Sequence, residues 1–243
     1  TLTPKLPVLL ANDSRLLPQT FRGGQLNVQE IKGLSVDAGR VDRVNQRDSS
    51  DYEKMTITTT GAKGIVGGQA RSDAFNFAGL AYQWNERLNT GYNYGGLDDF
   101  YHQHQFSLVH VLPLGAGQTL KSDLRYARST DDGHSNIDNN AFGAMFTYAL
   151  GGHAFGLGYQ RMSGDTGFAY VNGTDAFLVN FVQINDFANK DERSWQARYD
   201  YNFAALGVPG LTFMTRYLSG DSIDLGAGKP DGHEWERDTD IGY

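Results

Sequence analysis

The stretch SWQARYDYNF, residues 194–203, alternates between two kinds of side chain. Because successive side chains of a β-strand point to opposite faces, this pattern describes a ribbon with one aromatic and one polar face. The first face carries Trp195, Ala197, Tyr199, Tyr201 and Phe203, and the second carries Gln196, Arg198, Asp200 and Asn202. A soluble sandwich would bury the aromatic face in a core, whereas a membrane barrel would place it in lipid around a wet interior. This strand by itself leaves both alternatives open.

The composition favours the barrel. Only 40% of the 243 residues are hydrophobic and the mean hydropathy is −0.46, yet the chain contains 13 Tyr, 14 Phe and 30 Gly. A membrane barrel uses half of its strand positions for a polar interior and carries aromatic residues on its outer surface. A disordered chain would be poorer in aromatic residues. We therefore treat 1–243 as a single β domain.

The composition also argues against several other functions and partners. The chain has no Cys, which removes disulfides, thiolate metal sites and cysteine nucleophiles. Its formal net charge of −7 argues against nucleic acid as a partner, because phosphate binding needs a basic surface. No run of about 18 apolar residues occurs, so the sequence predicts no transmembrane helix. A spanning β-strand needs only about 10 residues and remains compatible with the hydropathy.

Turns and loops alternate in length along the chain. The tight turns are 85–89, 113–118, 151–152 and 205–210, and the longer connections are 43–72, 130–139, 163–193 and 220–237, with a short exception near 95–99. This rhythm is typical of an up-and-down barrel with short turns at one rim and long loops at the other. It predicts about ten antiparallel strands within 33–243. The segment 1–24, which contains Pro4, Pro7 and Pro18, is predicted to be a loop.

Further segments repeat the two-faced pattern. Apolar or aromatic side chains alternate with small or polar ones in 120–128, 141–150, 153–161 and 211–218. Several aromatic residues lie near the tight turns, as expected for an aromatic girdle at a membrane interface. We therefore expect Trp195, Tyr199, Tyr201 and Phe203 to face outward and Arg198 and Asp200 to face the wet interior. We also expect no helix longer than two or three turns.

The chain is expected to be a piece of a longer protein. It begins without an initiating Met or a signal peptide, and it ends inside an alternating segment. The outermost strands, predicted near 33–42 and 238–243, would then lack partners. An open, curved sheet or an incomplete barrel follows from this expectation.

Three long stretches resemble one protein family. They are NDSRLLPQTFRGGQLNVQEIKGLSVDAG (12–39), GLDDFY (96–101) and SWQARYDYNFAALGVPGLTFMTRYLSGDSID (194–224), and they resemble the OprD family of Pseudomonas outer-membrane porins. The resemblance implies an all-β, antiparallel transmembrane β-barrel of eighteen strands, one pore per chain, narrowed by an inward-folded constriction loop at 1–24. It implies a passive, substrate-selective channel in the Gram-negative outer membrane for small water-soluble carboxylates such as amino acids or aromatic acids. It implies no enzyme activity and no cofactor, contact with outer-membrane lipid and lipopolysaccharide, and a homotrimer as one option for assembly.

The resemblance also points to individual site residues. Arg15 corresponds to an arginine on the constriction loop, and Tyr170, Asp175 and Asp186 correspond to residues of a long loop that folds toward the narrowest point. Asp99 corresponds to an aspartate near the rim. Two positions differ from one branch of the family, so the branch to which this chain belongs, and with it the class of substrate, stays open. The branch that transports basic amino acids has Ser where this chain has Ala176, and it has His where this chain has Arg40.

The charged residues allow a functional and a structural interpretation. Arg15, beside Asp13, would bind a solute carboxylate through the fixed donors of its guanidinium, or it would pin the loop to the wall by an ion pair. Lys121, Arg125, Arg198 and Arg216, with Asp123 and Asp200, share the polar faces of their strands. They would either draw anions into the interior or pair with one another and keep the wall wet and rigid.

Other chemistry is less well supported by the sequence. SGDSID (219–224) lacks the Gly-Gly that would complete a serine-protease motif, so catalysis is not expected. His102 and His104 would share a strand face, and the Asp-rich segment 129–140 could bind calcium, but exposed rim residues explain both without a metal. A soluble β-domain that binds a ligand or glycan remains the alternative function, and folding without detergent would support it.

Overall fold

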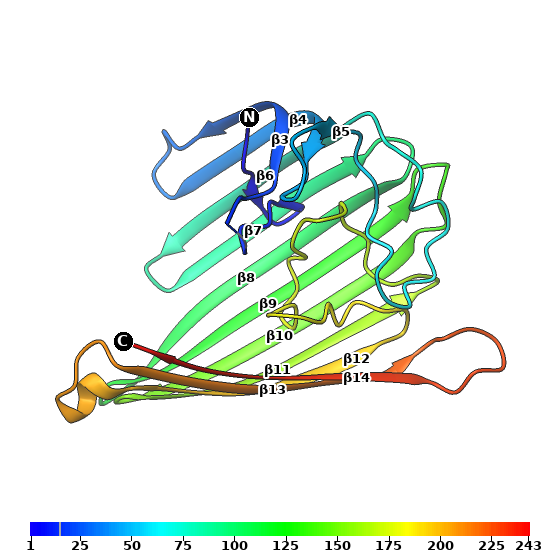
Figure 1. Ribbon diagram of the computed structural model, residues 1–243. Coiled ribbons are helices and arrows are strands. Elements are labelled where there is room, and N and C mark those ends of the chain that lie inside the picture. Colours follow the sequence, from blue (N-terminus) through cyan, green and yellow to red (C-terminus); the bar gives the residue numbers. More distant parts are fainter. Residues whose placement is uncertain (15) are drawn as a thin grey trace.

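The computed structural model describes residues 1–14 and 16–243, and its long strands follow one another around one curved sheet (Figure 1). Every pairing between strands is antiparallel, and within the described residues the main sheet contains 12 strands. Eleven of them, in order across the sheet, are β3 (Thr20–Val28), β4 (Leu34–Asn45), β6 (Phe75–Asn85), β7 (Leu88–Leu97), β8 (Tyr101–Gly115), β9 (Gln118–Asp131), β10 (Asp138–Leu150), β11 (His153–Gly164), β12 (Arg193–Asn202), β13 (Thr212–Ile223) and β14 (Gly232–Gly242). The short β5 (Tyr52–Glu53) pairs only with β4, and β1 (Lys5–Leu6) and β2 (Leu9–Leu10) form a separate hairpin.

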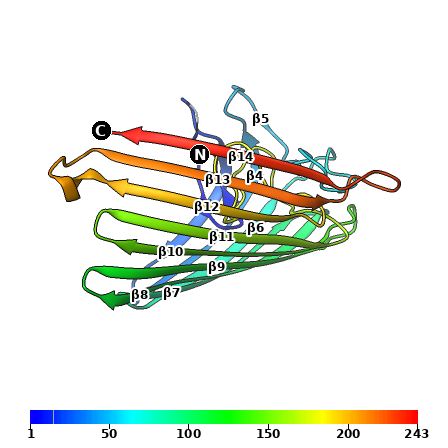
Figure 2. The same cartoon turned by 90° about the horizontal axis from the view of Figure 1, so that it is seen from below.

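Connections of different length lie at opposite ends of the sheet. Turns at 86–87, 116–117 and 151–152 join strands at one end, and the long segments 46–74 and 165–192 join them at the other. Figure 2 shows the short turns gathered at the end opposite the long loops. The predicted up-and-down order is therefore confirmed.

The register of β11 and β12 places their aromatic residues on the convex face. Trp195 lies opposite Tyr159. The Trp195 side chain is 45% exposed, whereas the adjacent Gln196 is 2% exposed because segment 165–192 covers the concave face. The alternation confirms an outward position for Trp195, Tyr199 and Tyr201 and an inward position for Arg198 and Asp200. Phe203 follows the strand, in the four-residue 3₁₀ helix η1 (Phe203–Leu206), so its predicted place in the strand is wrong.

Three predicted boundaries are also wrong. The loop predicted over 1–24 ends earlier, because β3 begins at Thr20 and pairs with β4. For the same reason the strand near 33–42 is not an edge strand: β4 pairs with β3 on one side and β6 on the other. The connection predicted over 220–237 is shorter, since β13 continues to Ile223 and β14 resumes at Gly232. The loop prediction rested on Pro4, Pro7 and Pro18, which all precede β3, and the bulge at Gly23 (φ +159°) interrupts the alternation of this strand.

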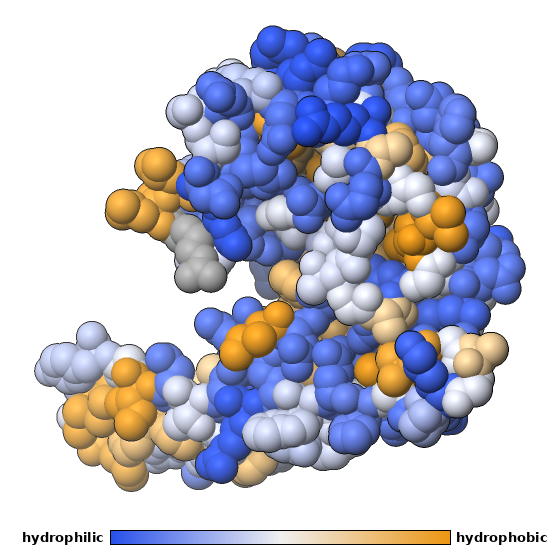
Figure 3. All heavy atoms as spheres, turned by 45° about the vertical axis from the view of Figure 1, so that its right-hand side comes forward, coloured by the Kyte–Doolittle hydropathy of each residue, from blue (hydrophilic) through white to orange (hydrophobic). Residues whose placement is uncertain are grey.

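The sheet is open, as expected. β3 and β14 are its two edges, and no described residue joins them. Figure 3 shows the molecule curving around a wide hollow. Among the described residues η1 is the only helix, and none is long and apolar enough to cross a bilayer.

Two segments fill part of the concave side: residues 1–14 and the loop 165–192 (Figure 1). A buried apolar cluster joins the first segment to β3–β8 and to segment 46–74. Its members include Leu6, Val8, Leu9, Phe21, Val41, Val44, Met55, Ile57, Phe75, Phe77, Leu97 and Tyr101. The concave interior is thus narrowed at the long-loop end by packed protein.

Candidate functional site

Small residues on the inner wall make room for loop 165–192. A Cβ at Gly143 would lie 2.9 Å from the Val179 side chain, and a Cβ at Gly158 would lie 3.2 Å from the Asn180 amide oxygen. Asn180 in turn donates to the Ser194 hydroxyl at 2.8 Å. The glycines on the polar parity of β10 and β11 therefore allow the loop to lie directly against the wall.

An ion pair joins this loop to segment 46–74. The Lys63 ammonium lies 3.0 Å from an Asp186 carboxylate oxygen, and only 2% of the Lys63 side chain is exposed. Tyr170 donates its hydroxyl to the same carboxylate, and its ring lies 5.5 Å from the Lys63 nitrogen. Burial, followed by the negative charge of Asp186, raises the pKa of Tyr170, so the hydroxyl stays a donor.

This cluster differs from the sequence prediction in two respects. Tyr170 is buried and does not line open space, and one oxygen of the Asp186 carboxylate is bonded by both Lys63 and Tyr170. Lys63 was missed, because a lysine in a Gly-rich loop carries no local signal that distinguishes it from an exposed one.

Asp175 joins the same loop to the N-terminal segment. Its backbone N–H donates to the Leu10 carbonyl at 2.8 Å, and its carboxylate accepts from the Asn12 amide at 2.5 Å. Arg47 also donates to Asn12. Burial raises the pKa of Asp175, and the bond from Asn12 and the charge of Arg47 oppose this rise. Segments 1–14 and 165–192 are thus in contact, as the resemblance implied.

Two predicted residues of the N-terminal segment contribute little to the described geometry. Asp13 is exposed and forms no hydrogen bond or ion pair with another described residue. Arg15 lies outside the described residues, so its role at the constriction stays a prediction.

Two of the inner-wall arginines hold the loop. Arg125 pairs with Asp123 through two hydrogen bonds of 3.0 and 2.8 Å, donates to the Leu178 carbonyl and stacks on Phe177, with 4.0 Å from guanidinium carbon to ring centroid. Arg216 holds the loop in the same way. It pairs with Asp238 at 2.7 Å and donates to the Val182 carbonyl at 3.2 Å, and only 10% of its side chain is exposed.

Arg198 has no such contact with the loop. Its Nε and Nη2 atoms bond both oxygens of Asp200 at 2.8 and 2.7 Å, and 36% of its side chain is exposed. Its second terminal nitrogen, Nη1, has no hydrogen-bond partner among the described residues. Lys121 is exposed on the same inner face and has no ion-pair partner in the described part of the chain. Arg198 and Lys121 thus keep cationic donors exposed on the inner wall of the described chain.

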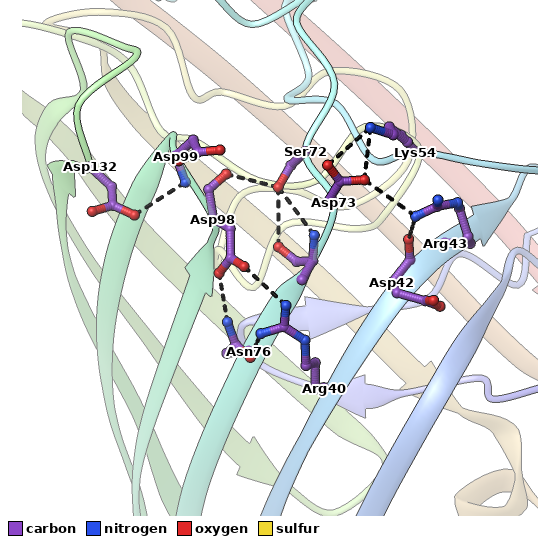
Figure 4. A network of polar contacts seen from close by, with 11 residues as sticks. Arg40, Asp42, Arg43, Lys54, Ser72, Asp73, Asn76, Asp98, Asp99 and Asp132 are labelled. Carbon is purple, nitrogen blue, oxygen red and sulfur yellow. Dashed lines mark hydrogen bonds and ion pairs between the residues drawn. The ribbon is translucent and has the colours of Figure 1, made fainter.

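Asp99 lies at the rim, at the long-loop end of β7 and β8 (Figure 4). Its backbone, in the turn between β7 and β8, has a φ of +73°, and its N–H donates to Asp132 at 3.2 Å. The neighbouring Asp98 pairs with Arg40 at 3.3 Å and accepts from the Asn76 amide at 2.6 Å. These bonds tie the rim ends of β4, β6 and β7 together.

Sequence reasoning also missed two buried carboxylates that contact residues 184–189 of loop 165–192. Glu192 is 1% exposed and accepts from the backbone and side chain of Asn189, both at 2.9 Å. Glu236, on β14, accepts from the backbone N–H groups of Ile184 and Asn185 at 3.0 and 2.8 Å. Glu236 was missed because the loop predicted over 220–237 hid the inward parity of β14, and Glu192 because it falls in the loop predicted over 163–193.

The pKa of Glu192 is strongly raised. Burial is the main cause, and the neighbouring Glu234 carboxylate adds to it, so the pKa reaches about 8. A carboxyl group with this pKa is protonated near neutral pH and can donate its proton in a hydrogen bond to Glu234. The end of the loop is therefore held in part by a neutral acid.

The described residues contain no group of three or more His, Asp or Glu arranged to hold a metal ion. His102 and His104 bond instead to the hydroxyl groups of Tyr94 and Tyr92, at 2.7 and 2.8 Å.

The family model described as "outer membrane porin, OprD family" matches residues 1–243. The chain belongs to the OprD family of outer-membrane porins. OprD-family porins of Pseudomonas lie in the outer membrane of Gram-negative bacteria, and porins are channels without catalytic chemistry. The predicted family, fold class and location are therefore confirmed.

Solved OprD-family structures share the same fold. The crystal structure of Pseudomonas aeruginosa OpdQ is 66% identical with a TM-score of 0.95, over 99% of this chain and 64% of that one. Pseudomonas aeruginosa OccK7 (OpdD) is 59% identical with a TM-score of 0.92, over 99% and 62%. A BenF-like porin from Pseudomonas fluorescens is 38% identical with a TM-score of 0.91, over 99% and 61%.

Curated OprD-family relatives are more distant in sequence. The porin-like protein GalP of Pseudomonas putida is 37% identical over 91% of this chain and 53% of its own length. Porin D of Pseudomonas aeruginosa is 36% identical over 91% and 51%. The chain thus spans about half the length of the curated relatives it matches.

Proposed function

We propose that the full-length protein is a passive, substrate-selective diffusion channel for small water-soluble carboxylates such as amino acids or aromatic acids. The solute moves down its gradient and must bind weakly enough to leave again. No specific observation favours a soluble ligand- or glycan-binding domain, and the exposed aromatic face of β11 and β12 argues against one.

The observation that carries this proposal is the difference between Arg198 and the other wall arginines. Arg125 and Arg216 each use part of their donor set on loop carbonyls. Arg198 leaves its Nη1 donors free and exposed. A solute carboxylate could bond this free edge while Asp200 keeps the guanidinium oriented.

Lys121 supports the same proposal from a neighbouring part of the wall. As a compact charge on a flexible stem, it would attract an anion without fixing its orientation. Asp123 and Asp200 offset the charges of Arg125 and Arg198, so the wall as a whole does not present a purely positive field. We expect selectivity from local contacts at Arg198, with Lys121 steering the approach.

Uptake measurements on the full-length protein in liposomes test the role of Arg198. Arg198→Gln removes the charge and the free donor edge, and we expect uptake of benzoate relative to a neutral solute of similar size to fall about two- to fivefold. Arg128→Gln is the matched control, because Arg128 lies on the outward face of β9 and pairs with Asp138. The control should leave the ratio unchanged.

Equal benzoate-to-neutral ratios in Arg198→Gln and the unsubstituted protein would contradict the proposal. Arg15→Ala tests the predicted role of Arg15 in the same uptake assay. We expect a wider pore and a weaker preference for carboxylates over neutral solutes. Four further predicted residues are proposed to contribute to selectivity by positioning the segments 1–14 and 165–192. These are Asp13, Tyr170, Asp175 and Asp186. Contact of the convex face with outer-membrane lipid and lipopolysaccharide is part of the proposal, and a homotrimer stays one option for assembly.

A further inference from the structure

Outward-facing arginines near the long-loop end of the sheet are mostly paired with aspartates. Arg22 lies 2.8 Å from Asp42, Arg40 lies 3.3 Å from Asp98, and Arg193 lies 3.7 Å from Asp221. Arg128 pairs with Asp138. These pairs balance the charge of the rim on β3, β4, β9 and β12.

Arg161 is an exception among these arginines, although its strand, β11, is hydrogen-bonded to a strand on each side. Among the described residues its guanidinium forms no hydrogen bond and no ion pair. In the register it lies directly opposite Phe142 on β10 and Arg193 on β12. Two like charges directly opposite each other on adjacent strands repel, so an anion beside Arg161 would be stabilising. Arg237 also lacks a partner in the described chain, but it lies on the edge strand β14, where nothing covers one side.

A groove of about 560 Å³ lies beside Arg161 on the convex face. Tyr126, Asn140, Phe142, Tyr159, Arg161 and Ser163 line it. Tyr126, Phe142 and Tyr159 are 40%, 44% and 43% exposed, so the groove presents apolar rings to whatever surrounds the barrel. It combines an aromatic floor with a cationic end.

The polar end of the groove offers unused donors. Tyr126 donates its hydroxyl to the Asn140 side-chain oxygen at 2.7 Å, which orients the Asn140 amide nitrogen away from Tyr126. This nitrogen and the Ser163 hydroxyl have no hydrogen-bond partner among the described residues. Together with Arg161 they form a set of donors suited to a phosphate group, which accepts several hydrogen bonds and carries negative charge.

We propose that this groove binds a phosphate group of an outer-leaflet glycolipid, with Arg161 pairing the phosphate and the aromatic floor contacting the apolar chains. Charge complementarity selects an anion, and the continuity of the groove with the lipid-facing aromatic surface selects a lipid. A free phosphate ion would make no use of the rings. This proposal rests on the lipid contact of the convex face that the proposed function includes, and it is independent of the solute passage.

Binding of diphosphoryl lipid A to the detergent-solubilised full-length protein, followed by native mass spectrometry, tests the proposal. We expect Arg161→Gln to weaken binding about tenfold, the effect of losing one charge-assisted contact of about 1.4 kcal/mol. Arg161→Lys, which keeps the charge, should retain most of the affinity. Arg40→Gln is the matched control at the same rim, and it should bind like the unsubstituted protein.

Two results would overturn the proposal. The first is equal lipid A affinity in Arg161→Gln and Arg40→Gln. The second is displacement of lipid A by inorganic phosphate at millimolar concentration, which would show a plain anion site without lipid recognition. Heat-modifiable migration in gels verifies that each variant is folded, so a loss of binding cannot be mistaken for a loss of structure.

Discussion

The two segments on the concave side, 1–14 and 165–192, differ in how much they depend on charged contacts. Residues 1–14 pack into an apolar cluster on β3–β8, where Leu9, Phe21 and Phe75 are all 0% exposed. The loop 165–192 packs on a second, smaller apolar cluster that includes Ala127, Ala141, Met162 and Phe168. It makes in addition a set of charged and polar contacts. These contacts are the Lys63–Asp186 pair, the loop carbonyls bonded by Arg125 and Arg216, and the carboxylates of Glu192 and Glu236.

This difference predicts different responses to conditions. Apolar burial does not depend on protonation and depends little on salt. Buried ion pairs and neutral acids depend on the protonation state of each member. We therefore expect the passage to keep its shape beside the apolar cluster and to change first beside β12–β14.

The largest expected effect is a truncation within the apolar cluster. Phe75 contacts Tyr101 edge-on, with 6.5 Å between ring centroids and an interplanar angle of 65°. Phe75→Ala should lower the free energy of unfolding by about 3–5 kcal/mol, because it removes a buried ring and leaves a cavity. Urea unfolding in detergent micelles measures this. Phe106→Ala, on the outward face of β8, is the control and should cost less than half as much.

A comparable loss in the two Phe variants would remove the distinction between the apolar cluster and the convex face. It would mean that the segment 1–14 adds little to the packing of β6. The comparison between the two segments would then rest on the charged contacts of loop 165–192 alone.

The second effect concerns the buried ion pair. Lys63→Met keeps the length of the side chain but leaves the Asp186 carboxylate without its cation, and we expect a loss of about 2 kcal/mol. Lys54→Met is the control, because Lys54 pairs at 2.8 Å with Asp73, whose side chain is 66% exposed. It should change stability by less than about 1 kcal/mol.

A double variant sharpens this prediction. In Lys63→Met/Asp186→Asn the buried charge is gone, so part of the lost stability should return. A double variant less stable than Lys63→Met would show that Asp186 stabilises the loop mainly through its bond with Tyr170.

The smallest expected effect is a dependence of the stability of loop 165–192 on pH, which arises from Glu192. Its folded pKa of about 8 lies above the ordinary value of 4.5, so the folded state holds the proton more tightly than the unfolded state. The stability that this provides is fully present below about pH 4.5 and is lost as the pH rises through about 8. Between pH 7 and pH 9 the loop 165–192 should lose on the order of 1 kcal/mol.

Amide hydrogen exchange of 165–192, corrected for the intrinsic effect of pH, measures this loss. Glu192→Gln should abolish the change, because the amide mimics the protonated acid. Segment 1–14 is the internal reference and should keep its protection at both pH values. Equal loosening of both segments would contradict the greater dependence of loop 165–192 on charged contacts.

Much of the fold was predictable from local pattern. The alternation in 194–203 places Trp195 and Arg198 on opposite faces whatever the rest of the chain does, because a strand has a period of two. The alternation of short turns and long loops was also predictable. Consecutive antiparallel strands reverse direction, so successive connections lie at opposite ends of the sheet. β3 was missed, because Pro4, Pro7 and Pro18 predicted a loop over 1–24 and the bulge at Gly23 interrupts the alternation.

The roles of the charged residues were decided by tertiary structure. Arg125, Arg198 and Arg216 are equivalent in the sequence, each an arginine on the polar parity of a strand. Only the path of loop 165–192 separates them, because its carbonyl groups reach Arg125 and Arg216 and leave one edge of Arg198 free. Likewise, Lys63 and Glu192 acquire their roles from burial by segments distant in the sequence. Burial and partner choice depend on contacts between such segments, and no local spacing encodes them.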